Sequence, residues 1–333
     1  MSIDTLNTLV TNLSKRRVLV IGDAVLDEYL IGKTTRLSRE APIPVLEFES
    51  RELIPGGATN PAANIVSLGS TAVQVGVVGA DAQATSLRQI LQGRGIEIGG
   101  LVTDSTRPTT VKTRIMAQMG LRFPQQVARI DTLSREPVGD SAARRIREII
   151  RDEIPQADAV LLSDYHLGLL TPSLVKAVRQ QARQAGILLT ADAQGSLYKY
   201  QGFALVKCNA DEARAFLQRD IRGDDAFANA ARALCDNLKL TGGMVITRGA
   251  DGATLATHDG DVVHCPAPSV TDVYDTVGAG DTAIAVITLA VIAGGTLADA
   301  VTLANYASGV VIRHVGNYTP TPDELSQALE AWR

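Results

Sequence analysis

Short apolar runs, several of them rich in β-branched residues, alternate along the chain with longer amphipathic segments. The runs 17–23 (RVLVIGD), 72–79 (AVQVGVVG) and 187–193 (ILLTADA) have the length and composition of buried parallel strands. Segments such as 81–93 and 172–185 have the pattern of helices that pack on such strands. This alternation predicts an α/β fold with a doubly wound, mostly parallel sheet and right-handed crossovers.

Two stretches interrupt the alternation, at about residues 30–54 and 106–130. Both contain short extended pieces in which polar and apolar residues alternate, and the first has prolines at 42 and 44. Such a composition fits the strands of a small separate sheet better than helices. We therefore expect one α/β domain over residues 1–333, in which the two insertions pair to form a small β-sheet lid.

A glycine-rich turn, 275–281 (DTVGAGD), leads directly into the apolar run 282–294 (TAIAVITLAVIAG). The run predicts a buried helix, and the first N–H groups of a helix point outward and carry partial positive charge. Gly278, Ala279 and Gly280 would present these groups, and a backbone without Cβ atoms can approach a bound group closely. The turn is therefore suited to a phosphate group.

Asp281, the last residue of this turn, would lie beside such a phosphate. A carboxylate in this place could take a proton from a hydroxyl group. The alternative is an ordinary helix cap that follows a tight turn. The complete seven-residue pattern before an apolar helix, in the last fifth of an α/β chain, favours the functional interpretation.

Further polar residues follow predicted strands of the first half. Asp23 ends the first strand, Asp27 comes shortly after it, and Asp164 follows the strand within 157–168. Open α/β sheets bind ligands at the carboxyl ends of their strands, so these residues are substrate-binding candidates. The alternative for Asp27 is a solvated acid in a loop.

The segment 55–69 (PGGATNPAANIVSLG) places a glycine pair before a predicted helix. Gly56 and Gly57 would allow a sugar to approach the backbone closely. Asn60 offers both a donor and an acceptor to neighbouring hydroxyls, or it could simply cap the helix.

Two patterns of the second half are ambiguous from the residues alone. Asn209 and Glu212 are spaced as a helix cap with an acid in the first turn, which is a common arrangement. Thr247, Gly249 and Gly252 lie in a predicted strand–turn–strand segment that would also suit a plain hairpin.

Composition and charge exclude several classes of function. The net charge of −4 is spread over the chain without a basic tract, so we expect no nucleic-acid or membrane partner. The start of the sequence lacks the apolar core of a signal peptide, and 282–294 is shorter than the roughly 20 residues that span a membrane. Cys208, Cys235 and Cys265 are odd in number and widely spaced, which predicts buried free thiols. These features predict a soluble cytoplasmic protein.

The segment DTVGAGD with its apolar helix resembles the C-terminal signature of the ribokinase-like (PfkB) carbohydrate kinases, although Thr282, Ala283 and Ile284 stand where the family has a phenylalanine. The other motifs occur in the order typical of that family. The resemblance implies that Asp281 is the catalytic base, that the amides of 278–280 form the anion hole, and that Asp27 binds sugar hydroxyls.

The same resemblance implies the nucleotide and metal contacts. ATP would be the co-substrate, lined by Asn209, Thr247, Gly249, Gly252 and the helix that begins near Asn305. Glu212 would hold Mg²⁺ through water. The carbonyls of Asp275 and Val277 would contribute to a site for a monovalent cation such as K⁺. The lid would cover the sugar and would form a homodimer contact.

A narrower resemblance concerns the segments 34–48, 55–69 and 125–131. They are similar to the kinases that act on D-glycero-β-D-manno-heptose 7-phosphate, in which lysines usually replace Leu167 and Gln194. Arg36, Lys112, Arg114 and Arg129 could supply the missing positive charge, or each could simply lie on a solvated surface. Arg129 is the substrate-binding candidate among them. No nucleotidyltransferase segment follows in the sequence, so we expect the form with a single activity.

Other interpretations remain open at this point. The acceptor could be fructose, ribose or a hexose phosphate, or the chain could be a non-catalytic module that binds a sugar or nucleotide. An NAD-dependent dehydrogenase is excluded, because the segment after the first strand, GDAVLDEY, lacks the required glycine-rich turn.

Overall fold

The computed structural model describes residues 2–119 and 124–332. Within these residues, a nine-stranded sheet forms the body in the order β13-β12-β11-β10-β9-β8-β1-β4-β5. Its strands are β1 (Arg17–Gly22), β4 (Thr71–Val78), β5 (Glu97–Thr103), β8 (Ala159–Ser163), β9 (Leu188–Asp192), β10 (Leu205–Asn209), β11 (Gly243–Thr247), β12 (Ala253–Thr257) and β13 (Val262–Cys265). In this order, all neighbouring strands from β5 through β1 to β11 pair in parallel, whereas β12 and β13 add an antiparallel edge. The predicted doubly wound, mostly parallel sheet is confirmed.

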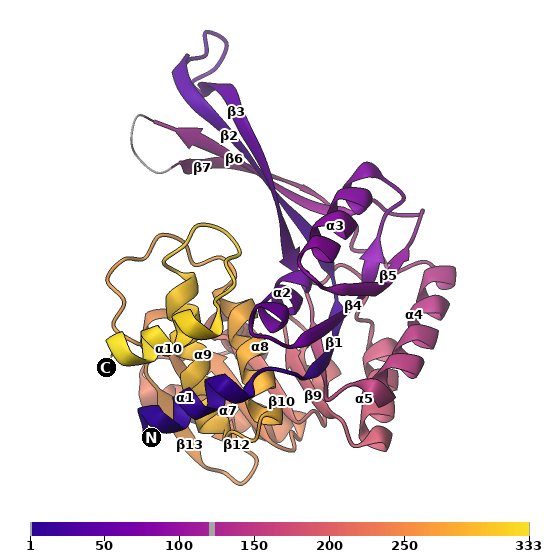
Figure 1. Ribbon diagram of the computed structural model, residues 1–333, viewed down its shortest axis with the longest axis vertical. Coiled ribbons are helices and arrows are strands. Elements are labelled where there is room, and N and C mark those ends of the chain that lie inside the picture. The colour runs from indigo at the N-terminus through magenta and orange to yellow at the C-terminus, as the bar shows by residue number, and fades with distance from the viewer. Residues whose placement is uncertain (1, 120–123, 333) are drawn as a thin grey trace.

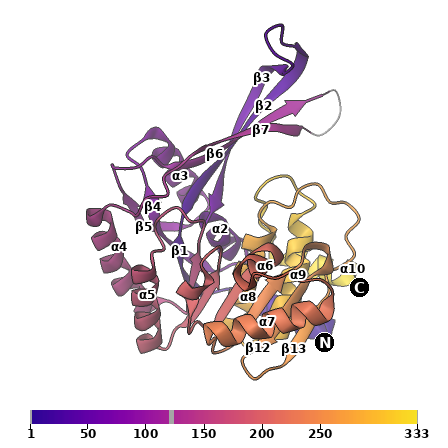
Figure 2. The same cartoon turned by 180° about the vertical axis from the view of Figure 1, so that it is seen from behind.

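Helices cover both faces of this sheet (Figures 1 and 2). One face carries α1 (Ile3–Asn12), α2 (Thr59–Ser67), α3 (Ala82–Gly93), α8 (Ala279–Ile292), α9 (Leu297–Val311) and α10 (Pro322–Ala331). The other face carries α4 (Asp140–Glu153), α5 (Pro172–Ala185), α6 (Ala210–Leu217) and α7 (Asp224–Leu238). Short 3-10 helices occur at Ile154–Gln156, Leu197–Tyr200 and Gly249–Asp251. Alternate residues of β1 pack into the two cores, Val18 and Val20 into one and Leu19 and Ile21 into the other, so the strand is apolar after its first residue, Arg17.

Helix α8 lies in the interior, as its apolar sequence predicted. It packs against β9 and between α2 and α9, and it is buried on all sides over most of its length. A helix without a polar face is stable in water only when it is covered in this way. Its burial fixes the start of the helix, and with it Asp281, relative to the carboxyl ends of the strands.

The second sheet is the lid, whose strands are β2 (Ala24–Leu37), β3 (Pro44–Gly57), β6 (Thr110–Gln118) and β7 (Gln125–Thr132), in the order β3-β2-β6-β7. Figure 1 shows the lid projecting from the body as a twisted ribbon. The two predicted insertions do pair with each other, although residues 120–123 of the second lie outside the described part. The strands extend beyond the expected bounds, because β2 continues from β1 after a single residue and β3 runs to Gly57, just before α2.

The order of strands reverses next to β1, which lies between β4 and β8. Such a reversal opens a crevice at the carboxyl ends of the strands, where open α/β sheets bind ligands. Asp23 follows β1 at this edge, and Asp192 ends β9. The three cysteines are buried free thiols, as predicted. Among the helices described, none combines the length and apolarity that a bilayer crossing requires.

Candidate active site

Helix α8 begins at a glycine turn. Gly278 is its N-cap residue with a φ of +84°, a left-handed conformation that glycine adopts without strain. A Cβ atom there would lie 2.9 Å from Nδ2 of Asn60, so the packing also requires glycine. Ala279 and Gly280 follow, and the first helical hydrogen bond is donated by Thr282 to Gly278. The amides before that bond belong to the positively polarised start of the helix.

Asp281 is the third residue of α8, and its side chain does not cap the helix. Its Oδ1 accepts a hydrogen bond from the Tyr165 hydroxyl at 2.6 Å, and its Oδ2 accepts one from Nδ2 of Asn60 at 3.0 Å. The residue is buried, with 7% of its surface exposed. The alternative of an ordinary helix cap is therefore wrong, since Gly278 occupies the cap position.

The surroundings of Asp281 change its acidity. Burial, and then the negative charge of Asp192, raise the pKa of Asp281 to about 6. The hydrogen bonds from Tyr165 and Asn60 and the charge of Lys207 act in the opposite direction and limit the rise. The carboxylate is thus ionised at neutral pH and is more basic than an ordinary aspartate, which suits a general base.

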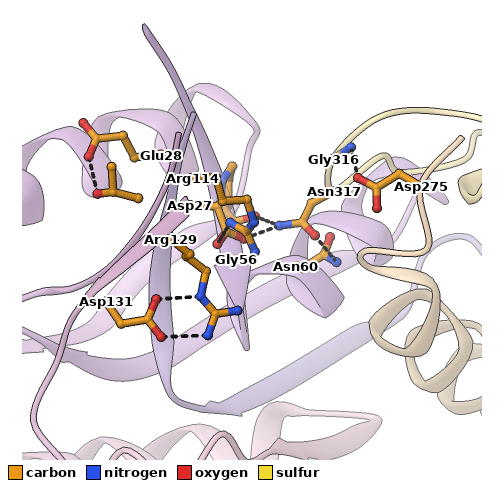
Figure 3. Close-up of polar contacts among 12 residues, drawn as sticks. Asp27, Glu28, Gly56, Asn60, Arg114, Arg129, Asp131, Asp275, Gly316 and Asn317 are labelled. Atoms are coloured by element: carbon orange, nitrogen blue, oxygen red, sulfur yellow. Dashed lines mark hydrogen bonds and ion pairs between the residues drawn. The ribbon is translucent and has the colours of Figure 1, made fainter. Parts of the chain in front are cut away.

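A chain of hydrogen bonds joins Asp281 to the lid, and Figure 3 shows the part of it that runs from Asn60 through Asn317 to Asp27. Nδ2 of Asn60 also lies 3.5 Å from Oδ1 of Asn317, and Nδ2 of Asn317 donates to Oδ2 of Asp27 at 2.7 Å and to the Pro55 carbonyl at 2.9 Å. These side chains are buried. The structure therefore brings together Asp27, Asn60 and Asp281, three of the residues that the sequence predicted for the acceptor site.

Asp27 lies in lid strand β2 and is 3% exposed, so the alternative of a solvated loop acid is wrong. Gly56, on the neighbouring strand β3, makes room for it, since a Cβ atom there would lie 2.2 Å from Oδ2 of Asp27. Gly57 has a φ of +57° and packs against the Asp23 carbonyl. Both glycines end a strand instead of forming the predicted turn.

The inner face of the lid carries three cations. Arg114 pairs with Asp27 at 2.5 Å, and both side chains are buried. Burial alone would lower the pKa of Arg114, but the charge of Asp27 more than offsets this and the pKa is raised. Arg129 lies opposite Arg114 on β7 and forms a two-bond ion pair with Asp131, which lies opposite Lys112 (Figure 3). The two carboxylates neutralise part of the positive charge.

A cavity of about 1000 Å³ opens beside the start of α8. Its wall combines the carboxyl ends of β9, β10 and β11 with the start of α6, the turn before α8 and one side of α9. The predicted residues that line it are Gly278, Ala279, Gly280, Asp281, Asn209, Thr247, Gly249, Gly252 and Asn305. The predicted catalytic turn and most of the predicted nucleotide residues thus share one cavity.

Lys207, on β10, is a buried cation in this wall that the sequence analysis did not identify. Its Nζ donates to Oδ2 of Asp192 at 2.7 Å and to the Gly280 carbonyl at 3.3 Å. Burial alone would lower the pKa of Lys207, but the charges of Asp192 and then Asp281 more than offset this, so the pKa is raised and the amine stays charged. A positive charge is therefore held against the glycine turn.

The far end of the cavity is built around the segment between β11 and β12. Gly252 has a φ of +80°, and a Cβ atom there would lie 2.2 Å from the Cys265 carbonyl. Nδ2 of Asn305 donates to that same carbonyl at 2.8 Å. Thr247 ends β11 and donates to the Cys208 carbonyl at 3.4 Å. The segment between β11 and β12, the end of β13 and α9 are thus held together as one wall.

Asn209 and Glu212 form a reciprocal capping box at the start of α6. The Asn209 side chain accepts from the Glu212 amide at 2.9 Å, and the Glu212 carboxylate accepts from the Asn209 amide at 2.7 Å. Burial raises the pKa of Glu212 to about 7, and the charge of Asp192 adds to the rise. The hydrogen bond from the Asn209 amide acts in the opposite direction. Glu212 and Asp192 are thus two carboxylates near the cavity that repel each other. Their oxygens are suitable ligands for a hard cation that keeps most of its water.

Asp275 connects the glycine turn to the segment after α9. Its Oδ1 accepts from the Val277 amide at 3.0 Å, and its Oδ2 accepts from the Gly316 amide at 2.9 Å (Figure 3). The segment of Asp275 and Val277, which was predicted to supply carbonyl groups to a monovalent cation, therefore lies next to the turn at Gly316. A smaller cavity of about 400 Å³ lies between the segment of Asp275 and Val277 and Arg114 of the lid.

Asp23 and Asp164 are not among the described residues that line these cavities. Oδ2 of Asp23 accepts from the amides of Tyr165 and Leu167 at 2.9 and 3.1 Å. Asp164 is 2% exposed and pairs with Lys199 and the Tyr200 hydroxyl. Their oxygens are thus directed at neighbouring chain segments instead of at a ligand.

The residues considered as contacts for a negatively charged substrate differ in their surroundings. Leu167 is buried, whereas Gln194 lines the large cavity. Arg36 is exposed on β2, and its nine-residue separation from Asp27 places it about 30 Å away along the strand. Of the four cations considered from the sequence, Lys112, Arg114 and Arg129 therefore face the site and Arg36 does not.

The sequence analysis missed Tyr165, Asn317 and Lys207. A lysine inside an otherwise apolar strand run, ALVKCN, was a signal that could have identified Lys207. Tyr165 follows a strand-end aspartate, but the pattern does not reveal the direction of its side chain. Asn317 lies in a turn near the C-terminus, 290 residues from its partner Asp27, and no local pattern points to it.

Relatives of the chain share its sequence over most of its length. The bifunctional protein HldE of Geobacter metallireducens is 40% identical over 308 residues, which are 92% of this chain and 61% of that protein. The HldE of Helicobacter pylori is 36% identical over 318 residues, which are 94% of this chain and 67% of that protein. The chain spans less than two thirds of the length of the first of these relatives.

Solved structures agree in fold. Ribokinase of Arabidopsis thaliana, complexed with ribose and ATP, has a TM-score of 0.73 at 18% identity and covers 95% of this chain and 99% of its own. Phosphofructokinase-2 of Escherichia coli, in complex with substrates and products, has a TM-score of 0.75 at 18% identity, with 96% and 99% covered.

The family match covers almost the whole chain. Residues 15–324 match the family described as pfkB family carbohydrate kinase. The ribokinase-like fold predicted from the motifs is confirmed by the structural neighbours. This chain therefore belongs to the pfkB family of carbohydrate kinases and is a phosphotransferase of that class.

Proposed function

We propose that this chain transfers the γ-phosphate of ATP to a hydroxyl of a sugar or sugar phosphate, with Asp281 as the general base. One observation carries the proposal: a buried carboxylate, held through both oxygens, lies in a cavity wall next to the polarised start of α8. Phosphoryl transfer depends mainly on positioning and on stabilisation of charge, and this arrangement supplies both.

The reaction would proceed by an in-line displacement. Asp281 takes the proton of the acceptor hydroxyl, whose oxygen attacks the γ-phosphorus. The new O–P bond forms while the bond to the bridging oxygen breaks, and ADP leaves with that electron pair. The amides of 278–280 and the ammonium of Lys207 face the charge that moves.

The nucleotide would lie along the far end of the large cavity, against Asn209, Thr247, Gly249, Gly252 and Asn305. Mg²⁺ would be held through water by Glu212 and would neutralise charge on the phosphates when bound. The carbonyl groups of Asp275 and Val277 would hold K⁺ beside the turn.

The sugar would bind where Asp27, Asn60 and the glycine pair meet. The inner face of the lid holds three cations and two carboxylates, so positive charge is in excess there. This excess supports an acceptor that carries one phosphate. Together with the sequence resemblance, this favours heptose 7-phosphate, phosphorylated at its 1-hydroxyl. Fructose, ribose and hexose phosphates are the competing acceptors.

We further propose that the protein is a cytoplasmic homodimer formed through the lid. Large apolar side chains are exposed on the lid, among them Leu37, Ile43, Phe48, Val127 and Ile130. Burying such residues against a second copy would remove them from water.

Measuring ADP release with a panel of sugars and sugar phosphates would identify the acceptor. We expect ADP release from ATP with heptose 7-phosphate to exceed that with fructose 6-phosphate, ribose 5-phosphate and the unphosphorylated sugars. Arg129→Gln should raise the KM for heptose 7-phosphate about tenfold, since a charge-assisted hydrogen bond of this kind is commonly worth such a factor. It should leave the KM for ATP unchanged.

Arg36→Gln is the matched control, because Arg36 is also an exposed arginine of the lid but lies about 30 Å from Asp27 along β2. An equal loss in both variants would reject a phosphate contact at Arg129. Absence of ADP release with every acceptor of the panel would reject the kinase and favour a binding module.

The dependence of activity on pH follows from Asp281. Its pKa is raised to about 6, and a base works only in its deprotonated form. We therefore expect kcat/KM for the acceptor to fall on the acid side with a midpoint near pH 6 and to be constant from about pH 7 to 8. Steady-state kinetics in buffers of constant ionic strength measure this, and a midpoint near pH 4 would contradict the assignment.

A further inference from the structure

Tyr165 connects the proposed base to the lid. Its hydroxyl donates to Oδ1 of Asp281 at 2.6 Å, and it lies in the wall of the large cavity. Nζ of Lys112, on lid strand β6, lies 4.9 Å from the centre of its ring. The loop after β8 thus places one side chain against both parts of the site.

Tyr165 is itself held in place by Asp23. Oδ2 of that carboxylate accepts from the Tyr165 amide at 2.9 Å and from the Leu167 amide at 3.1 Å, and Asp23 is 5% exposed. Burial raises the pKa of Asp23, and the two amides act against that rise. A buried carboxylate that does not face the cavity therefore has a definite task, which is to fix the loop that carries Tyr165.

We propose that Tyr165 is a positioning residue: held by Asp23 and by Lys112 of the lid, its hydroxyl fixes the Asp281 carboxylate in the orientation that receives the proton of the acceptor. This inference rests on the proposed function, because it assigns Asp281 the role of base. Asn60 anchors the other oxygen, so without Tyr165 the carboxylate is free to turn about that single bond.

The charges around the pair determine the sign of the expected effect. Asp192 of β9 and Lys207 of β10 face Asp281 with opposite charges, and Tyr165 faces it from the loop. Burial, and then the charge of Asp281, raise the pKa of Tyr165 well above its ordinary value, so its hydroxyl remains a donor. Its hydrogen bond favours the ionised form of Asp281, and removing it should raise the pKa of the base.

Tyr165→Phe tests this directly. We expect the acid limb of kcat/KM for heptose 7-phosphate to move up by about one pH unit, as expected for one hydrogen bond to a carboxylate. At pH 7 kcat should fall roughly ten- to a hundredfold, because a misplaced group loses about this much. The KM for ATP should not change. An acid limb at the wild-type position, with kcat within twofold, would overturn the proposal.

Tyr200→Phe is the matched control. The Tyr200 hydroxyl also donates to a buried carboxylate at 2.6 Å, that of Asp164, but away from the cavity. This variant should lose comparable stability in thermal unfolding and keep the wild-type pH profile. The same shift in both variants would show that Tyr165 acts only through the fold.

A measurement without acceptor separates this proposal from the proposed function and does not require the Phe variant to fold. In protein labelled with ¹³C at the tyrosine ζ carbons, one of the seven tyrosine signals should titrate with a midpoint near pH 6, following Asp281. That titration should disappear in Asp281→Asn. If no tyrosine signal behaves in this way, Tyr165 does not contact the ionised carboxylate and the proposal fails, whatever the substrate panel shows.

Discussion

Asp281→Asn should lower kcat roughly a thousandfold, which is the loss typical of removing a general base. The substituted side chain keeps the size of aspartate and can still accept from Tyr165, so the acceptor and ATP should bind with little change in KM. What is lost is the capacity to take the proton from the hydroxyl. Steady-state ADP release at pH 8 measures the effect.

Stability should not fall in the same variant. The pKa of Asp281 is about 6 in the folded chain against an ordinary 3.8, so the folded state holds the proton more tightly. The ionised carboxylate therefore destabilises the fold once the pH has risen through about 6. Removing its charge offsets the loss of the hydrogen bond from Asn60, so the melting temperature at pH 8 should stay close to that of the wild type.

Asp299→Asn is the matched control for position in a helix. Asp299 is the third residue of α9, as Asp281 is of α8, but it interacts with the Thr296 cap. If the two variants lost activity equally, Asp281 would be no more than a favourable helix-start charge. Turnover of Asp281→Asn close to the wild type would end its assignment as base.

The second large effect concerns Lys207. Lys207→Met should lower kcat about a hundredfold, because it removes a charge that faces the transferring group. It should also cost roughly 3–5 kcal/mol of unfolding free energy, since it leaves Asp192 buried without its partner. Urea denaturation and ADP release measure the two losses separately.

Two further variants separate stability from catalysis. In Lys207→Met combined with Asp192→Asn the unpaired charge is gone, so stability should return in large part while kcat stays low. Lys199→Met removes a comparably buried lysine, paired with Asp164 away from the cavity, and should lose stability but keep kcat. Recovery of activity in the double variant would mean that Lys207 has only a structural role.

The body of the fold could be predicted from the sequence because burial on both faces of a parallel sheet leaves a local trace. After Arg17 every position of β1 is apolar, and α8 lacks a polar face, so each run was recognisable without knowledge of its neighbours. The bounds of the lid were less certain. Strand β2 continues from β1 after one residue, and no turn residues mark the change from body to lid.

The candidate site could be predicted where its residues lie in one short motif. Asp281 and the glycines before it fall within seven positions, and Gly56, Gly57 and Asn60 are similarly close together. Residues whose role depends on the direction of the side chain could not be found in this way. Asp23 and Asp27 look equivalent in sequence, yet Asp23 holds the loop of Tyr165 while Asp27 pairs with Asn317 and with Arg114 of the lid.

The contact between Asn317 and Asp27 joins residues 290 positions apart. On the ribosome, the amide of Asn317 is made 290 residues after the carboxylate of Asp27 to which it donates. A nascent chain can fold its first strands and its lid, but it cannot close this contact until residue 317 has left the exit tunnel. The network that holds Asp27 should therefore form in one late step, once residue 317 has left the exit tunnel, and not gradually as the chain grows.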